Sequence, residues 1–178
     1  MVSDGEITLF SEFIFPEVIH LWSINVSKTL LYSSSKITSI VEFKGDIGIA
    51  IELNWEKRYI NRDQHPKSEA DNVIIDNGKI LKIRKKISEC KDNQIVGEFI
   101  GLMKLSKNGS KQLVDCYEKI HTHEGKFHDA QSMEKAKLID LLQELIENKI
   151  KINAIPITGK WCEIDTLQDL EIAKKLFI

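Results

Sequence analysis

The clearest hydrophobic pattern in the chain runs from Asp46 to Leu53, where every second residue is aliphatic. This alternation predicts a strand with one buried face, because successive side chains of a strand point to opposite faces of its sheet. Residues 95–105 form another apolar run, with glycines inside it, and also predict a buried strand. Between the two, Asp76-Asn77-Gly78 separates short apolar runs. It predicts a tight hairpin, since Asn-Gly accepts the positive φ of such turns.

Three segments have the spacing of amphipathic helices. Residues 133–148 carry apolar side chains at intervals of three and four, with Ser132 placed as the N-cap. Residues 167–177 repeat the pattern, and residues 107–121 show it more weakly. A further strand is predicted at residues 150–157. Strands and helices therefore mix along the chain, which favours the α/β or α+β class.

Length and composition are those of an ordinary globular protein. The 178 residues favour one domain, 1–178, in which residues 6–22 are apolar without a clean period and residues 30–32 resemble the end of a strand. A net charge of −2 gives no electrostatic reason to expect nucleic acid as a partner. No apolar run approaches the roughly 20 residues that cross a bilayer, and the first residues lack the pattern of a signal peptide. Three widely spaced cysteines match neither a disulfide framework nor a zinc site. We expect a cytoplasmic protein with no membrane or nucleic-acid partner.

Two carboxylates, Glu163 and Asp165, stand two positions apart at the end of a predicted strand, just before a predicted helix. Alternation along the strand places them on the same face, and two oxygens directed at one point suit a hard cation such as Mg²⁺. The alternative is that Asp165 or Thr166 only caps the helix, with Asp169 completing a Thr-x-x-Asp box. On spacing alone, the cap is favoured.

Other candidate residues also have a structural interpretation. Trp55 and Tyr59 follow the clearest strand and could stack on a base, although Trp55 could equally close the end of the core. Glu98 lies among apolar strand residues, so its charge needs either a ligand or a structural ion pair. The histidines and Glu124 within residues 121–128 could chelate a metal, but solvated histidines in a polar loop are the commoner case.

An ordered set of segments resembles the C-terminal portion of bacterial nucleotidyltransferases of the sugar-phosphate and choline-phosphate cytidylyltransferase type. The resemblance covers about residues 45–178, so that 46–178 would be the acceptor and metal half, and 1–45 a remnant of the nucleotide half. The segments that carry it are Trp55 with Tyr59, His65-Pro66-Lys67-Ser68-Glu69-Ala70, Gly97-Glu98-Phe99-Ile100-Gly101-Leu102, Lys135-Ala136 through Asp140-Leu141-Leu142-Gln143, and Trp161-x-Glu163-Ile164-Asp165-Thr166.

The resemblance implies a truncated Rossmann-like α/β fold, a mixed sheet with flanking helices. It also implies transfer of a nucleotidyl group from an NTP such as CTP to a phosphorylated sugar or a phosphocholine-like acceptor, with release of pyrophosphate and with Mg²⁺ as cofactor. Asp165 matches the metal-binding aspartate of the family, and Lys85 lies where relatives carry a lysine near the acceptor phosphate. Glu98, Trp55 and Tyr59 fall on the acceptor side.

The chain departs from this family in the nucleotide-binding half. Relatives have a Leu-Ala-Ala-Gly-x-Gly-x-Arg segment and a Pro-Lys pair that this sequence lacks. Their earlier metal-binding aspartate falls at Thr29 or, with a long insertion, at Asp4. Two interpretations follow: an acceptor half that forms product only with a partner segment, or a non-catalytic binding or scaffold module. Since half a sheet would expose an edge, we also expect a homodimer or binding to another chain.

Overall fold

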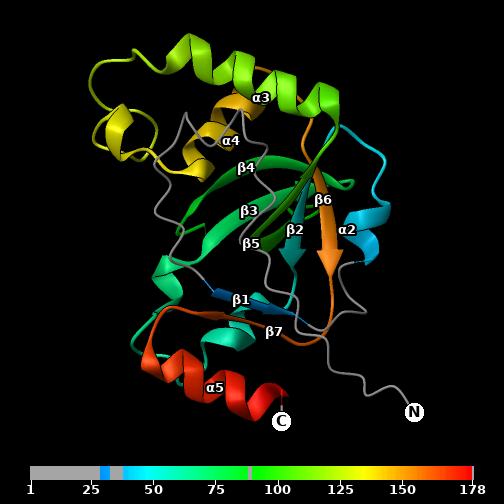
Figure 1. The fold of residues 1–178 in the computed structure, drawn as a ribbon, viewed down its shortest axis with the longest axis vertical. Coiled ribbons are helices and arrows are strands. Elements are labelled where there is room, and N and C mark those ends of the chain that lie inside the picture. The colour runs from blue at the N-terminus through cyan, green and yellow to red at the C-terminus, as the bar shows by residue number, and fades with distance from the viewer. Residues whose placement is uncertain (1–28, 33–37, 88–89, 178) are drawn as a thin grey trace.

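The computed structural model describes residues 29–32, 38–87 and 90–177. Its centre is a five-stranded sheet that closes into a barrel in the order β2-β5-β3-β4-β6 (Figure 1). The strands are β2 (Ile47–Glu52), β3 (Asp71–Asp76), β4 (Lys79–Lys85), β5 (Ile95–Leu105) and β6 (Asn153–Ile157). Among the described strand pairs of this barrel, only β2 and β6 are parallel. The barrel closes where Lys79 of β4 pairs with Asn153 of β6.

The hairpin between β3 and β4 is confirmed. Asn77 and Gly78 form its turn with φ values of 46° and 73°, and Asp76 pairs with Lys79 directly beside it. The strand predicted at 95–105 is also confirmed, and its Gly97 makes room for a side chain rather than a ligand. A Cβ at Gly97 would lie 2.4 Å from Cγ2 of Ile51.

The prediction that β2 buries only one face was wrong. All six residues of β2 are buried. One face joins the main core between the barrel and the helices, and the other joins a second cluster containing Ala50, Ile100 and Trp161. The short helix α2 (Thr38–Glu42) covers this second cluster with Ile40. Small residues alternate with the isoleucines of β2 because the second face is closely packed against other side chains. They do not indicate a solvent-exposed face.

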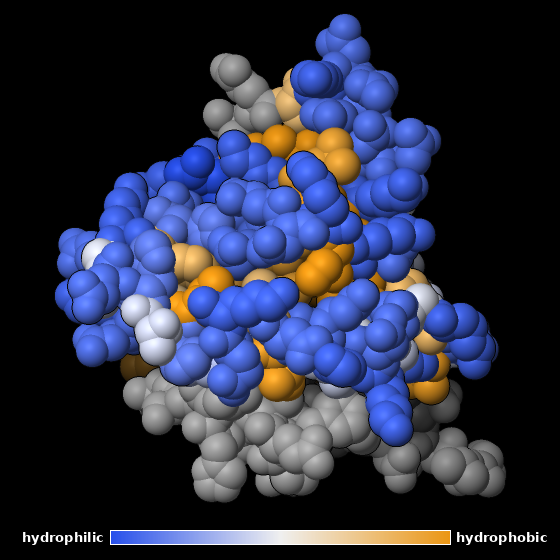
Figure 2. Space-filling view, turned by 90° about the horizontal axis from the view of Figure 1, so that it is seen from above, coloured by the Kyte–Doolittle hydropathy of each residue, from blue (hydrophilic) through white to orange (hydrophobic). Residues whose placement is uncertain are grey.

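Helices α3 (Lys107–Ile120) and α4 (Leu138–Glu147) form a layer above the barrel (Figure 1). The surface of this side is mostly hydrophilic, with hydrophobic side chains exposed in narrow strips (Figure 2). Apolar residues of both helices, such as Leu113 and Leu142, face inward and pack with those of the strands. The helix predicted at 107–121 is therefore confirmed. The main core lies between this layer and the barrel.

The helix predicted at 133–148 was wrong in its first turn. Residues Met133–Lys135 form a 3₁₀ turn, η4, and Ser132 makes no side-chain cap bond. Helix α4 begins only at Leu138, because Asp140 accepts hydrogen bonds from the backbone N–H of Lys137 at 2.7 Å and of Asp129 at 3.2 Å. The buried carboxylate thus fixes the start of the helix to the preceding loop.

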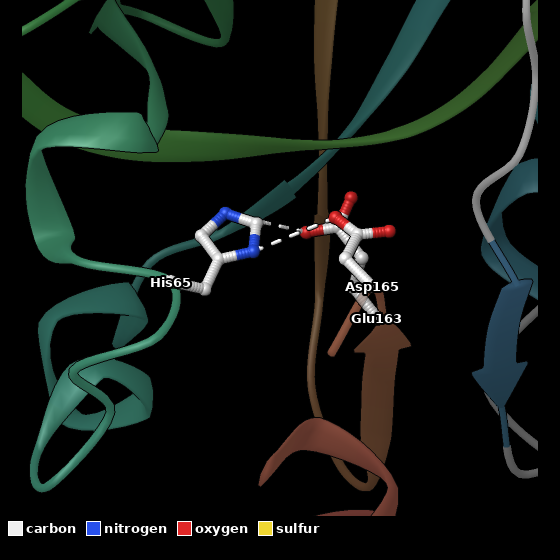
Figure 3. Close-up of side chains that lie close together, drawn as sticks. All are labelled: His65, Glu163 and Asp165. Carbon is white, nitrogen blue, oxygen red and sulfur yellow. Dashed lines mark ion pairs between the residues drawn. The ribbon is translucent and has the colours of Figure 1, made fainter. Parts of the chain in front are cut away.

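A second, two-stranded sheet lies below the barrel, where β1 (Thr29–Tyr32) pairs antiparallel with β7 (Trp161–Ile164). Helix α5 (Leu167–Phe177) follows β7, as the sequence predicts. The 3₁₀ turns η2 (Trp55–Tyr59) and η3 (Lys67–Glu69) lie between β2 and β3 along the chain. They bring the segment around His65 next to the end of β7 (Figure 3).

The observed class is α/β with a mixed sheet and flanking helices, as predicted. The Rossmann-like arrangement remains a prediction, since the sheet of the described residues closes as a barrel. Residues 1–28, which include Asp4 and most of the expected nucleotide-half remnant, lie outside the described residues. No described helix is long and apolar enough to span a bilayer.

Candidate functional site

The junction between β7 and α5 is capped by the box that the sequence suggests. Oγ1 of Thr166 accepts a hydrogen bond from the backbone N–H of Asp169 at 3.1 Å. In return, Oδ2 of Asp169 accepts from the N–H groups of Thr166 at 3.0 Å and Asp165 at 3.2 Å. Thr166 and Asp169 therefore form the cap, and the side chain of Asp165 is not needed for it. The cap and a metal-ligand role for Asp165 are compatible.

Glu163 and Asp165 both point toward the ring of His65 (Figure 3). Nδ1 of His65 lies 3.5 Å from Oδ2 of Asp165, and Nε2 lies 3.9 Å from Oε2 of Glu163. The prediction that the two carboxylates share a face is thus confirmed. We call these three residues the His65 cluster; their potential ligand atoms all lie within 4.8 Å of one another. Sequence reasoning missed His65 as a member, because it comes from a loop far away along the chain.

Arg62 holds the His65 cluster against helix α5. Its Nε donates to Oδ1 of Asp169 at 2.6 Å, and both side chains are buried. Its Nη2 lies 3.3 Å from Nδ1 of His65, and because a guanidinium can only donate, Nδ1 is the acceptor. Burial disfavours the ionised form of Asp169, but the hydrogen bonds from Arg62 and Thr166 outweigh it and lower the pKa of Asp169.

Glu98 and Tyr59 form a buried pair beside this cluster. The Tyr59 hydroxyl donates to Oε1 of Glu98. Burial raises the pKa of Glu98 to about 7; the hydrogen bond from Tyr59 opposes this rise, and the charge of Glu163 adds to it. Burial, with the charge of Glu98, also raises the pKa of Tyr59. The partner of Glu98 is thus a hydroxyl and not the cation of a structural ion pair.

Two buried polar atoms at this position, one on Glu98 and one on the neighbouring Asn72, have no hydrogen-bond partner among the described residues. Oε2 of Glu98 and Nδ2 of Asn72 make no hydrogen bond there. The two residues are direct neighbours across β3 and β5, so their side chains project from the same face of the sheet. Buried polar atoms are rarely left without a partner in folded proteins, because each costs about 1–3 kcal/mol. These two atoms are therefore candidates to bind a water or a ligand.

Trp55 and Lys85 occupy structural positions. Trp55 packs edge-on against Tyr59, with ring centroids 6.1 Å apart, in a small core with Ala70. This is the structural alternative that the sequence leaves open for Trp55. Lys85 ends β4 and forms an ion pair with Glu69, and this contact lowers the pKa of Glu69. The functional roles expected for Trp55 and Lys85 stay predictions.

Glu52 joins three segments at the opposite end of β7, a role that sequence reasoning missed. Oε2 of Glu52 accepts from Nε1 of Trp161 at 3.0 Å and from Nη2 of Arg58 at 3.2 Å. Arg58 also donates to the carbonyl oxygen of Gly159 at 2.8 Å. Glu52 pairs with Glu98 across β2 and β5. Of these two buried glutamates, Glu52 is satisfied through both oxygens and Glu98 through only one.

The remaining candidates are Thr29 and the histidines of residues 121–128. The backbone register places Thr29 opposite Ile164, the residue before Asp165. His121 and His123 contact the backbone carbonyl oxygens of Glu118 and Lys126. His128 instead approaches two glutamates of α4. The group of histidines suggested by their spacing is therefore not brought together as one ligand set.

No protein-family model matches the chain. Among curated proteins, the chain is similar to the CTP:phosphoglutamine cytidylyltransferase of Campylobacter jejuni, with 27% identical residues over 143 positions. The match covers 80% of this chain and 55% of the relative, so the chain spans about half the length of the curated relative it matches. A relationship to cytidylyltransferases is thereby supported. The similarity agrees at this level with the resemblance found in the sequence.

Proposed function

We propose that the chain is a nucleotidyltransferase-type protein that binds a cytidine nucleotide and a phosphorylated small-molecule acceptor beside the His65 cluster. The observation that carries this proposal is the convergence of Glu163 and Asp165 at the end of β7. The similarity to a cytidylyltransferase supports it independently of the geometry. In the proposed reaction the acceptor phosphate attacks the α-phosphorus of the nucleotide, a P–O bond to pyrophosphate breaks, and pyrophosphate leaves.

The carboxylates fit a Mg²⁺ ion, which takes one or two carboxylate oxygens and completes its shell with water and substrate phosphates. Asp165, with Glu163 beside it, would hold the ion. When bound, Mg²⁺ would offset the charge of the phosphates. His65 is the less suitable ligand for this ion, because its Nδ1 already accepts from Arg62. The role of Arg62 in this proposal is to hold the His65 ring beside the two carboxylates.

The acceptor would lie on the side of Tyr59 and Glu98. Oε2 of Glu98 can accept a hydrogen bond and Nδ2 of Asn72 can donate one, so the pair suits an acceptor group that carries both kinds of atom. Hydroxyl and amide groups have this property, whereas the quaternary ammonium of phosphocholine cannot donate. We therefore favour a phosphorylated sugar or amide over phosphocholine. Trp55 would form a wall of this site, and Lys85 would exchange Glu69 for the acceptor phosphate.

A second candidate is a binding or scaffold module without catalysis. It is favoured by the ion pair between Lys85 and Glu69 and by the burial of Trp55, which commit both proposed substrate residues to structural contacts. In this candidate the nucleotide still binds at the His65 cluster, and no product forms. Pyrophosphate release therefore separates the two functions.

The test is calorimetric titration of the purified chain with CTP, with and without Mg²⁺, followed by the same titration of Asp165→Ala. Saturable binding that needs Mg²⁺ and is lost in Asp165→Ala is the expected result. Glu134→Ala removes an equal charge from an exposed site and should bind CTP as the wild type does. Failure of CTP, a sugar 1-phosphate and phosphocholine all to bind would overturn the proposal. If CTP binds but no pyrophosphate is released in the presence of CTP and acceptor, the chain is the binding module without catalysis.

A further inference from the structure

A second group of metal-type ligands lies on the other side of the barrel from the His65 cluster. It consists of His128, from the loop between α3 and α4, with Glu144 and Glu147 of α4; we call it the His128 cluster. Nε2 of His128 lies 2.9 Å from Oε2 of Glu144, and Nδ1 lies 3.7 Å from Oε1 of Glu147. In Figure 1, α4 lies above the barrel and β7 lies below it, so the two clusters are separate sites.

The ligand atoms of the His128 cluster are held by the surrounding structure. Glu144 and Glu147 are three residues apart on a helix and therefore lie on one side of it. The second oxygen of Glu144 accepts from Nδ2 of Asn148 at 2.8 Å, and Glu147 accepts from Nε2 of Gln143 at 2.9 Å. Such bonds to the carboxylates orient metal ligands in known sites.

The position of His128 is also fixed. Its backbone has a φ of 49°, in the left-handed region, and the ring packs edge-on against Phe127 with centroids 4.5 Å apart. Phe127 in turn forms a β-bridge with Ala130. The loop therefore presents the imidazole to α4 in one orientation.

We propose that the His128 cluster binds a transition-metal ion of the zinc class. One imidazole nitrogen and two carboxylate oxygens are donors that such ions accept, and three protein ligands plus water is a common arrangement. Around a tetrahedral ion with bonds of about 2.1 Å, ligand atoms lie roughly 3.4 Å apart. The donor atoms of the cluster are all within 4.8 Å of one another, so small side-chain rotations would close the shell.

The surroundings leave room for the remaining coordination position. A hollow of about 360 Å³ is lined by His128 and Glu147, together with Arg84 and Lys126. Arg84 is paired with Asp129 at 2.8 Å, and no arginine hydrogen-bonds to His128 within the described part of the chain. This differs from the His65 cluster, where Arg62 donates a hydrogen bond to Nδ1 of His65. A water or a small anion in the hollow would complete the coordination.

The competing explanation is an ion pair in which a protonated His128 bridges the two glutamates without any metal. The two explanations differ in what added metal does. A bound ion would link the loop to α4 and stabilise the folded state by mass action, whereas a simple ion pair would not respond to the metal.

The experiment uses the full chain carrying Glu163→Gln and Asp165→Asn, so that the His65 cluster does not contribute. Zn²⁺ is titrated by calorimetry, and Co²⁺ is titrated by its visible absorption, which reports tetrahedral coordination. We expect one ion per chain, a higher urea midpoint with Zn²⁺, and no comparable binding of Mg²⁺. His128→Gln and Glu147→Gln should each weaken Zn²⁺ binding at least tenfold.

The matched control is Glu134→Gln, which changes an exposed acid outside the cluster and should bind Zn²⁺ unchanged. Glu147 is largely exposed, so Glu147→Gln should keep the helical circular dichroism of the parent and report on binding alone. Absence of saturable Zn²⁺ binding in the parent would overturn the proposal and leave the ion pair. Zn²⁺ affinity in Glu147→Gln and His128→Gln equal to that of the parent would also overturn it. Neither result depends on nucleotide binding.

Discussion

Arg62 and Asp169 form a buried ion pair, with 2.6 Å between Nε and Oδ1, that joins the loop carrying His65 to the first turn of α5. The same aspartate caps α5, and the same arginine contacts His65. One pair therefore supports both the helix and the His65 cluster. Its loss should affect stability and the cluster together.

Arg62→Met should destabilise the protein by about 3–5 kcal/mol, because it leaves the buried carboxylate of Asp169 without its cation. Urea unfolding measures the loss. The lowered pKa of Asp169 means that its stabilisation is present above the ordinary value of 3.8 and is lost as the pH falls below it. Lys174→Met breaks an exposed pair with Glu171 and should leave the midpoint almost unchanged. Equal effects of the two variants would contradict this account.

Glu98→Gln should remove a pH dependence of stability. The folded state holds the Glu98 proton up to a pKa of about 7, whereas the unfolded chain releases it near 4.5. Stability contributed by the protonated group is therefore complete below pH 4.5 and falls by about 3 kcal/mol as the pH rises to 7. Unfolding of both proteins from pH 4 to 8 checks this. The variant should become the relatively more stable one with rising pH, and parallel curves would show that Glu98 titrates normally.

Tyr59→Phe should raise the pKa of Glu98 further. The Tyr59 hydroxyl donates to the carboxylate and so favours its ionised form, and the variant removes this bond while keeping the ring. Carbon-13 NMR of labelled glutamate side chains measures the pKa directly. A Glu98 pKa that stays the same or falls in Tyr59→Phe would show that the hydroxyl does not control it.

Asp140→Ala should cost about 1–2 kcal/mol, because it removes the side chain that accepts from the N–H of Lys137 at the start of α4 and from the N–H of Asp129 in the preceding loop. Ser132→Ala is the matched control, since Ser132 is the N-cap expected from the pattern and makes no cap bond in the structure. It should change stability by less than about 0.5 kcal/mol. A larger loss of stability in Ser132→Ala than in Asp140→Ala would instead support a helix that begins at residue 133.

Lys85→Met should weaken binding of a phosphorylated acceptor by about 10-fold to 100-fold if Lys85 contacts the phosphate, as a charged hydrogen bond is worth about 1.5–3 kcal/mol. Lys79→Met removes an exposed lysine at the other end of the same strand and should leave binding unchanged. Calorimetry with a sugar 1-phosphate gives both affinities. Equal affinities of Lys85→Met and Lys79→Met for the sugar 1-phosphate would show that Lys85 only forms the ion pair with Glu69.

Local chemistry accounts for the features that the sequence predicts well. The turn at Asn77 depends only on backbone conformation, the shared face of Glu163 and Asp165 depends only on strand alternation, and the cap depends on Thr166 and Asp169 three residues apart. Each of these is decided by neighbours along the chain.

Features that depend on distant contacts were missed or misplaced. His65 meets the carboxylates only because η2 and η3 fold its loop against β7. Helix α4 starts late because Asp140 reaches back to Asp129, and β2 buries both faces because Ile155 and α2 cover the second. Periodicity records which residues are apolar; it does not record which elements cover them.

The most direct test of the central claim is phosphorus-31 NMR of CTP with Mn²⁺ in place of Mg²⁺ and substoichiometric protein. Wild-type protein should increase the paramagnetic relaxation of the nucleotide phosphates above that of free Mn²⁺–CTP. Asp165→Ala should abolish this increase, and Glu134→Ala should keep it. Relaxation that is the same with wild type and with Asp165→Ala would contradict a metal–nucleotide site at the end of β7.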